Sequence, residues 1–288
     1  METEAIKQNI ILKDERLDID QLDHYLLSFF IGSSSCELAV FDERKKRLLM
    51  LESYRFDPAK PLLENLKTLH YDHALISAGF WKRVEVVLRN SRFCQVPNAL
   101  YSGEHAYDYL KLNAPVDPLN EKYRSVLNKN QGVTSVFSVP NELISWFDGK
   151  YPKPLISFKH ESTVNIQAMG AQLGKSDEAQ LFINLTATDL QLAGYSDGRL
   201  HIYNQFALQS PEKAAKLILM SLQQFSKAGQ ATPITLWGIE RSINDYAPLL
   251  KKYYKQLRMG EKPKGLKMSH IFDRLAPYEY FDVMSSFL

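Results

Sequence analysis

The sequence is poor in cysteine and glycine, and each shortage excludes a class of protein. Two cysteines, Cys36 and Cys94, are too few for a disulfide framework and too far apart for a metal knuckle. Thirteen glycines in 288 residues, about 4.5% against a usual value of about 7%, leave little material for glycine-rich phosphate loops. A reducing compartment fits this cysteine usage, so we expect a cytoplasmic protein.

The sequence also lacks a dominant charge and a long apolar run. Thirty-five basic and 33 acidic residues give a net charge of +2, so no global field favours nucleic acid, membrane or an acidic substrate. The N-terminus is acidic where a secretory signal needs a basic start, and no segment has about 18 uninterrupted apolar residues. We expect no export signal and no membrane span. The composition is that of a globular protein, and the length predicts about two domains.

The most informative feature is an internal repeat, because residues 26–56 match residues 181–206. Phe41 aligns with Tyr195 at a separation of 154 residues, and Arg47 aligns with Arg199 at 152. The two-residue difference therefore falls in a turn, where length changes are tolerated. Each copy is predicted to form three strands, and Asp197-Gly198 is a strong hairpin signal in the second copy.

A helix and a further strand are predicted after each set of three strands. In the first copy a helical stripe follows Pro61 and runs to Ile76; in the second, Ser210 can cap a helix that has Pro211 at its first position. Apolar runs at residues 84–88 and 234–237 then predict the next strands. Both copies therefore have the order strand, strand, strand, helix, strand.

This order, repeated twice, is that of the ribonuclease H-like unit whose duplication makes the actin-like ATPase fold. We predict an α/β protein with two ribonuclease H-like domains in an actin-like ATPase arrangement, each a mixed five-stranded sheet with flanking helices. The first domain is expected to span residues 1–152, including an N-terminal extension, and the second residues 153–288.

Two local resemblances support the same family. Residues 29–41, FFIGSSSCELAVF, resemble the first phosphate hairpin of actin-like proteins such as the pilus-assembly ATPases, whose pattern is I-D-I-G-S-S-S. Residues 203–206, the Ser-Pro-Glu start of the next helix and the tyrosines near Tyr253 resemble a bacterial family that has an actin-like ATPase fold. The second resemblance implies a fold and no established activity.

The resemblance implies that ATP and magnesium would lie between the two halves, held by both first hairpins and an adenosine loop. Phe30 stands at the position of the family's essential aspartate, and phenylalanine can neither bind magnesium nor orient water. Asn184 stands at the matching position of the second copy and carries no charge. If a nucleotide binds, we expect the contacts to come from the residues that match the family's loops, namely Gly32, Ser33, Ser34, Ser35, Asn184, Thr186, Thr188 and Gly238.

Other motifs nominate no catalytic residue and no metal ligand. Residues 170–176 resemble a phosphate-binding P-loop, but three residues separate the two glycines where a P-loop has four. This spacing favours a helix end followed by a turn. His70 and His73 have the spacing of a metal pair on a helix but lack a third ligand. We expect no cofactor unless the nucleotide alternative holds.

Residues 251–267 carry seven basic residues and one acidic residue, a local balance of +6. The basic residues of this segment could bind phosphates, and the interleaved Tyr253 and Tyr254 could stack on a base. A solvated helix and turn explains it equally well, and we recognise no nucleic-acid-binding fold, so the sequence does not favour a nucleic-acid partner.

Three functional hypotheses follow. The first is a non-enzymatic interaction or assembly protein that keeps an actin-like scaffold with a degenerate nucleotide cleft and binds a protein partner or another copy of itself. The second is a nucleotide-binding actin-like ATPase or sensor that uses the eight residues named above. The third is a nucleic-acid binder that uses Lys251, Lys252, Lys255 and Arg258.

Overall fold

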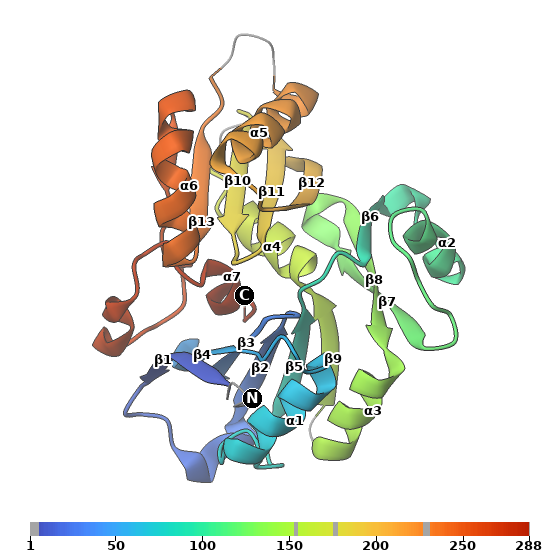
Figure 1. Cartoon of the computed structure of the whole chain (residues 1–288), viewed down its shortest axis with the longest axis vertical. Helices are drawn as coiled ribbons and strands as arrows, with labels where there is room; N and C mark the ends of the chain where they lie inside the picture. Colours follow the sequence, from blue (N-terminus) through green and yellow to red (C-terminus); the bar gives the residue numbers. More distant parts are fainter. Residues whose placement is uncertain (1–5, 153–154, 175–177, 227–230, 288) are drawn as a thin grey trace.

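The molecule contains two mixed β-sheets, which lie one above the other along its long axis (Figure 1). The computed structural model describes residues 6–152, 155–174, 178–226 and 231–287. The first sheet has the order β1-β4-β3-β2-β5-β9. Its strands are β1 (Lys7–Lys13), β2 (Tyr25–Ile31), β3 (Ser35–Asp42), β4 (Arg47–Arg55), β5 (Arg83–Leu88) and β9 (Leu155–His160).

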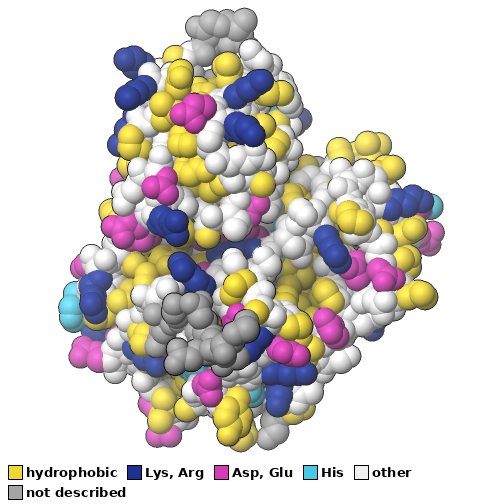
Figure 2. Space-filling view, viewed as in Figure 1, with side chains coloured by type: hydrophobic (Ala, Val, Ile, Leu, Met, Phe, Trp, Pro, Cys, Tyr) yellow, Lys and Arg dark blue, Asp and Glu magenta, His cyan; other side chains and the backbone are white. Residues whose placement is uncertain are grey.

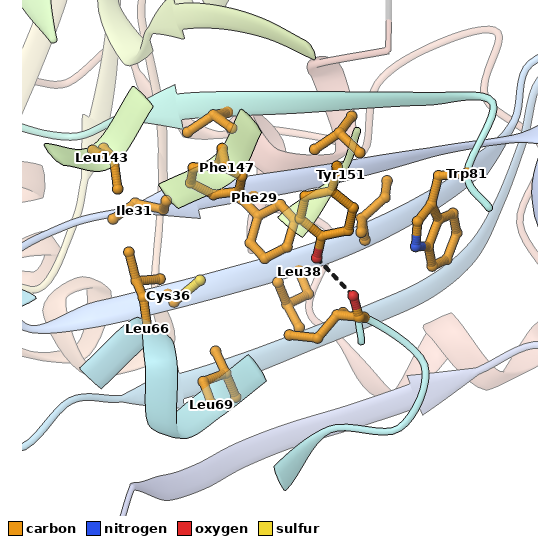
Figure 3. Close-up of a cluster of buried hydrophobic side chains, with 14 of the residues drawn as sticks. Phe29, Ile31, Cys36, Leu38, Leu66, Leu69, Trp81, Leu143, Phe147 and Tyr151 are labelled. Carbon is orange, nitrogen blue, oxygen red and sulfur yellow. Dashed lines mark hydrogen bonds between the residues drawn. The ribbon is translucent and has the colours of Figure 1, made fainter. Parts of the chain in front are cut away.

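One face of the first sheet is covered by α1 (Leu62–Asp72) and α3 (Asn141–Lys150). Figure 3 shows this core, in which Phe29 of β2 packs edge-on against Phe147 of α3 with ring centroids 5.1 Å apart. The Tyr151 hydroxyl, buried in the same cluster, donates to the Ile76 carbonyl at 2.7 Å. A buried hydroxyl is tolerated because it is hydrogen-bonded.

The second sheet has five strands in the order β12-β11-β10-β13-β14. The strands are β10 (Gln180–Leu185), β11 (Asp189–Ser196), β12 (Arg199–Ala207), β13 (Ile234–Gly238) and β14 (Leu257–Met259). The helices α5 (Pro211–Phe225) and α6 (Glu240–Tyr253) pack on one face of it. The predicted class, mixed sheets with flanking helices, is confirmed, and β1 adds a sixth strand to the first sheet.

The two sheets correspond strand by strand. In each, the first strand of the set pairs antiparallel with the second and parallel with the fourth. A register shift precedes Phe41 in β3 and Tyr195 in β11, and these two residues pair with Leu48 and Leu200 respectively. Phe41 and Tyr195, which are aligned in the repeat, therefore both follow the register shift in the second strand of their sheet. The superposition of the two halves stays a prediction.

Local sequence signals account for the turns and helix ends of the repeat. Asp197 and Gly198 adopt φ values of 52° and 70°, the left-handed geometry that a tight hairpin needs. The Ser210 side chain accepts from the Lys213 amide at 3.2 Å and caps α5, as predicted. The first helix is shorter than its apolar stripe suggested, because α1 ends at Asp72 and His73 already has extended backbone geometry.

A smaller three-stranded sheet, unforeseen in the sequence, is inserted between β5 and β9. It has the order β6-β8-β7, with β6 (Phe93–Pro97), β7 (Glu121–Asn128) and β8 (Val133–Pro140). The helix α2 (Ala106–Lys111) packs against it around the buried Leu110. Figure 1 shows this insertion projecting to the side of the two main sheets.

Two helices lie between the main sheets. They are α4 (Glu161–Gly170), which follows β9, and α7 (Phe281–Ser285), close to the C-terminus (Figure 1). The expected domain junction near residue 152 stays a prediction, and residues 153–154 lie outside the described residues. Because β9 pairs with β5, the first sheet extends beyond that junction.

Candidate functional site

The two hairpin turns that the sequence nominated for phosphate binding have the same form. In the first, the Gly32 amide donates to the Ser35 carbonyl at 2.9 Å, and Ser33 and Ser34 at the tip are exposed. In the second, the Thr186 amide donates to the Asp189 carbonyl at 2.9 Å, with an exposed Thr188. Both turns are thus closed by their own backbone.

The second turn is also closed by a side chain. The Thr186 hydroxyl accepts from the amides of Thr188 at 3.3 Å and Asp189 at 2.9 Å, which is a threonine turn. The Thr186 carbonyl accepts from the Ser242 hydroxyl at 2.7 Å. The amides of Thr186, Thr188 and Asp189 are therefore already hydrogen-bonded within the turn.

Gly238, the remaining candidate, is held against the second sheet. Its amide donates to the Tyr278 carbonyl at 3.0 Å, and its φ of 155° is rare for other residues. A Cβ at this position would lie 2.5 Å from the Leu185 carbonyl oxygen, too close for any side chain. Close packing of β10 against β13 therefore explains the glycine without a nucleotide base.

Phe30 and Asn184 occupy matching positions with different surroundings. Phe30 faces Glu37 across the β2–β3 ladder, and Asn184 faces Gln191 across the β10–β11 ladder. Phe30 is fully buried, and the Arg89 guanidinium carbon lies 4.9 Å from the centre of its ring. The Asn184 amide donates to the Gln191 side-chain oxygen at 3.1 Å. Neither side chain points into open solvent.

Arg89, one residue beyond β5, is the centre of a buried ionic cluster. Its Nε donates to Glu161 of α4 at 2.6 Å, and one Nη donates to Asp282 of α7 at 2.6 Å. The other Nη donates to Glu37 of β3. Three carboxyl groups from three distant parts of the chain thus bind one guanidinium. Only arginine has a planar group with several N–H donors in a fixed geometry, so lysine could not replace it here.

Burial shifts the pKa values of the carboxyl groups in this cluster. Burial raises the pKa of both Glu37 and Glu161 above the ordinary range. Burial also raises the pKa of Asp282, but Arg89 and a hydrogen bond from Glu161 outweigh it and hold that pKa low. The side chains of Glu161 and Asp282 are hydrogen-bonded to each other, and their pKa values are shifted in opposite directions, so the two groups titrate as a pair. Each of the three guanidinium nitrogens of Arg89 donates to a carboxyl group of this chain.

The cluster continues into the second sheet through neutral amides. The Gln191 side chain donates to Glu161, and its oxygen accepts from Asn165 of α4 at 2.8 Å as well as from Asn184. Asn165 also donates to the Tyr203 hydroxyl at 3.3 Å. A continuous polar network therefore joins β3, α4, α7 and β11.

Aromatic stacking fixes α7 against both sheets. Phe281 stacks on Trp237 of β13 with centroids 4.1 Å apart, and Phe287 stacks on Phe41 of β3 at 5.5 Å. The residues around α7 complete the apolar cluster that contains Phe30. The side chains at the junction of the two sheets therefore belong largely to the C-terminal segment.

The sequence analysis missed this cluster, although one signal was present. Glu37 and Gln191 are polar residues at matching positions of two otherwise apolar strands, and both enter the network. Arg89, Glu161 and Asp282 gave no such signal, because nothing local indicates that they meet.

The other motifs are placed apart from this cluster. His73 bonds Glu52 at 2.6 Å, whereas His70 packs edge-on against Trp146 and Tyr151, so the two rings face different neighbours. Among the described residues, no group of three metal-ligating side chains is found. Gly170 ends α4, and Lys175 and Ser176 of the P-loop imitation lie outside the described residues.

Two of the cavities lined by described residues are open to solvent and have volumes of about 990 and 580 Å³. The larger lies between β1, β4 and the end of α1, and the smaller between β12 and α5. Neither lining includes any of the eight residues nominated for a nucleotide. Over the described ranges, no helix combines the length and apolar character needed to cross a membrane.

Comparison with known proteins identifies the fold. A Bacteroides thetaiotaomicron protein described as having an actin-like ATPase fold and unknown function is 17% identical, with a TM-score of 0.80 over 94% of this chain and 98% of that chain. The structure described as the PilM-PilN type IV pilus biogenesis complex is 13% identical, with a TM-score of 0.57 over 90% and 97%. No curated protein matches the sequence.

These likenesses show the predicted actin-like ATPase fold. A family model described as a protein of unknown function, DUF3822, matches residues 14–257. The chain therefore belongs to the DUF3822 family.

Proposed function

We propose that this protein is a non-enzymatic interaction or assembly protein, an actin-like scaffold whose nucleotide cleft is degenerate. The observation that carries the proposal is Phe30, which replaces the expected carboxylate and is buried beneath Arg89. Without that carboxylate, nothing in the first hairpin would organise magnesium or the attacking water. The Arg89 guanidinium, which is already paired with three carboxyl groups of this chain, supports the same proposal.

An interaction role also agrees with the neighbours of the fold. The PilM structure similar to this chain is described as a complex with PilN, so a protein of this fold does assemble with another protein. Function is carried by sites and not by the fold, so this likeness supports the class of role and names no partner for this chain.

Nucleotide addition tests the proposal directly. A ligand present at 100 times its dissociation constant stabilises a protein by about 2.7 kcal/mol, which thermal unfolding detects easily. We expect millimolar Mg-ATP to leave the melting temperature of the protein unchanged. The Phe30→Asp variant restores the acidic position and serves as a comparison, although it places a charge in the sheet.

The rival proposal is a nucleotide-binding ATPase or sensor, with ATP and magnesium held by the eight residues named in the sequence analysis, of which Ser33, Ser34 and Thr188 are exposed. It predicts a thermal shift of several degrees and magnesium-dependent turnover that Asn184→Ala abolishes. That pair of results would overturn the degenerate-cleft proposal.

A further inference from the structure

An apolar groove with an acidic rim lies at one end of the molecule. The cavity of about 990 Å³ is bounded by the segment between β1 and β2 and by the end of α1. Its apolar lining includes Ile11, Leu17, Ile19, Leu22, Leu75 and Ala78. Ile11 is 48% exposed and Ile19 is 67% exposed, so part of this apolar lining is open to solvent. We call this cavity and its rim the acidic groove.

The ionic groups on the floor of the acidic groove neutralise one another. The Glu52 carboxylate accepts from the Tyr54 hydroxyl and from His73, each at 2.6 Å, and lies 3.0 Å from the Lys13 ammonium. Although burial raises its pKa, the hydrogen bonds from His73 and Tyr54 hold the pKa of Glu52 at about 2. The floor therefore needs no ligand to balance its charge.

The rim is different, because its carboxylates are unbalanced. Residues 14–23 contain five acidic residues and one arginine. Of these, the buried Asp14 pairs with Arg16 at 3.6 Å and with Arg47 of β4 at 3.8 Å, and Asp23 lies 3.9 Å from His24, so the unbalanced charge is on the exposed carboxylates. Glu15, Asp20 and Asp72 are exposed, and within the described residues none of the three forms an ion pair. A partner that fits must present an apolar group surrounded by positive charge.

The chain itself carries such a surface at the opposite end, where Figure 2 shows several Lys and Arg side chains at the top of the view. Tyr253, the last residue of α6, is 62% exposed, and Lys251, Lys252 and Lys255 around it are exposed without ion pairs among the described residues. We call these four residues the basic end. Arg258, which shares the segment, is held in the sheet by a 3.1 Å hydrogen bond to Thr235.

The positions of the two surfaces follow from the topology. The end of α6 lies beside the start of β13, where the Ile234 amide donates to Gln256 at 3.3 Å. The opposite end of β13 contacts Tyr278, which precedes α7 and the first sheet. The basic end is therefore far from the first sheet, and Figure 1 shows the dark-blue segment after β1 at the other extreme of the long axis.

We infer that the acidic groove of one copy binds the basic end of a second copy. Tyr253 would fill the apolar lining, and the three lysines would meet the carboxylates of the rim. Because the two surfaces differ, the contact is heterologous, and each association leaves one groove and one basic end free for further copies. This inference rests on the proposed interaction role and names the partner for it.

Sedimentation velocity over a range of protein concentrations tests the inference. The basic-end variant is Lys251→Glu, Lys252→Glu and Lys255→Glu, and the groove variant is Glu15→Lys, Asp20→Lys and Asp72→Lys. Each triple change should weaken self-association roughly tenfold or more, since each reverses three charge pairs. Tyr253→Ser should also weaken it while leaving the charge unchanged.

Mixing the two variants provides the decisive measurement. In the basic-end variant both surfaces are acidic, and in the groove variant both surfaces are basic, so neither variant should associate alone. In an equimolar mixture the acidic groove of the first variant can bind the basic end of the second, so the mixture should associate. A matched control reverses three exposed charges on the inserted sheet, Lys122→Glu, Arg124→Glu and Lys129→Glu, and should associate like the wild type. Wild-type association should also weaken between 50 mM and 500 mM salt.

Three results would overturn the inference: a wild type that stays monomeric at low salt, a mixture that stays monomeric, or a control as defective as the basic-end variant. Salt-dependent binding of a single-stranded oligonucleotide by a monomeric wild type would instead assign the lysines to nucleic acid. If Mg-ATP still fails to bind in any of these cases, the proposed function stands and only its partner is wrong.

Discussion

Arg89 is a single residue that links four parts of the chain. It joins β3, α4 and α7 through Glu37, Glu161 and Asp282, and its own position is fixed by β5. A buried charge cluster of this kind adds little stability over a well-packed apolar one, but removing one partner leaves the others buried and unpaired. Single substitutions in the cluster should therefore be costly.

Replacing Arg89 with methionine should destabilise the protein by about 3–5 kcal/mol in urea unfolding. The loss should grow with rising pH, because Glu161 then has no guanidinium beside it when its proton leaves. Arg55→Met is the control, since Arg55 is exposed at the end of β4 and its loss should cost less than about 0.5 kcal/mol. A loss below about 1 kcal/mol for Arg89→Met would show that the cluster is not formed as described.

His160 gives a pH prediction with a definite sign. Its ring bonds the Asn90 carbonyl at 3.0 Å and accepts from the Ser162 amide at 3.1 Å, which fixes the neutral form. Burial lowers its pKa from 6.5 to about 4. The unfolded chain therefore binds the proton first, and stability that is fully present above pH 6.5 is lost as the pH falls toward 4.

The size of that loss can be measured against a His160→Gln variant. Between pH 7.5 and pH 5 the histidine should cost the folded state about 2 kcal/mol, and the variant should lack this part of the pH dependence. A ring that titrates near pH 6.5 by NMR in the folded protein would contradict the assignment.

At the scale of elements, the parts that the sequence predicted are those with local signals. The hairpins, the cap at Ser210 and the strand order of both copies depend on neighbouring residues, and they were predictable for that reason. The predicted helix, which followed the apolar stripe to Ile76, is longer than α1. His73 lies outside the helix, and its side chain is hydrogen-bonded to Glu52. Tertiary contacts of this kind give no periodic signal.

The unpredicted elements depend on distant contacts. The inserted sheet has its own small core around Leu110, and α7 is a five-residue helix whose position is set by Trp237 and Arg89. The candidate site shows the same division. The sequence indicated that Phe30 breaks the family pattern, but it did not indicate which side chains surround the ring.

Phe281→Ala tests the role of α7. The substitution removes a fully buried ring stacked on Trp237, so we expect a loss of about 3–5 kcal/mol in urea unfolding. Leu119→Ala is the control, since Leu119 is 87% exposed and its truncation should change stability by less than about 0.5 kcal/mol. Equal losses in the two variants would mean that α7 does not pack between the sheets.

Gly238→Ala tests whether close packing or a nucleotide accounts for this glycine. A methyl group would press on the backbone of Leu185, and we expect a loss of at least about 2 kcal/mol without any ligand present. Gly149→Ala, where a Cβ has nothing within 4 Å, is the control and should be neutral or stabilising. A Gly238→Ala variant as stable as the wild type would remove the packing explanation.

At the scale of the whole molecule, α7 connects the two main sheets. Phe281 contacts the second sheet and Asp282 contacts the first through Arg89, so adjacent residues hold opposite halves. Two sheets tied in this way should unfold together, because breaking either contact exposes apolar surface on both of them.

A single cooperative transition is therefore expected for the wild type. With Trp81→Phe and Trp146→Phe in the background, Trp237 fluorescence reports on the second sheet, while far-UV circular dichroism reports on the whole chain. The two urea curves should coincide, and adding Phe281→Ala with Asp282→Ala should separate them, because each sheet then unfolds at its own denaturant concentration. Curves that already differ before the α7 changes are made would show that the halves are independent and that α7 does not couple them.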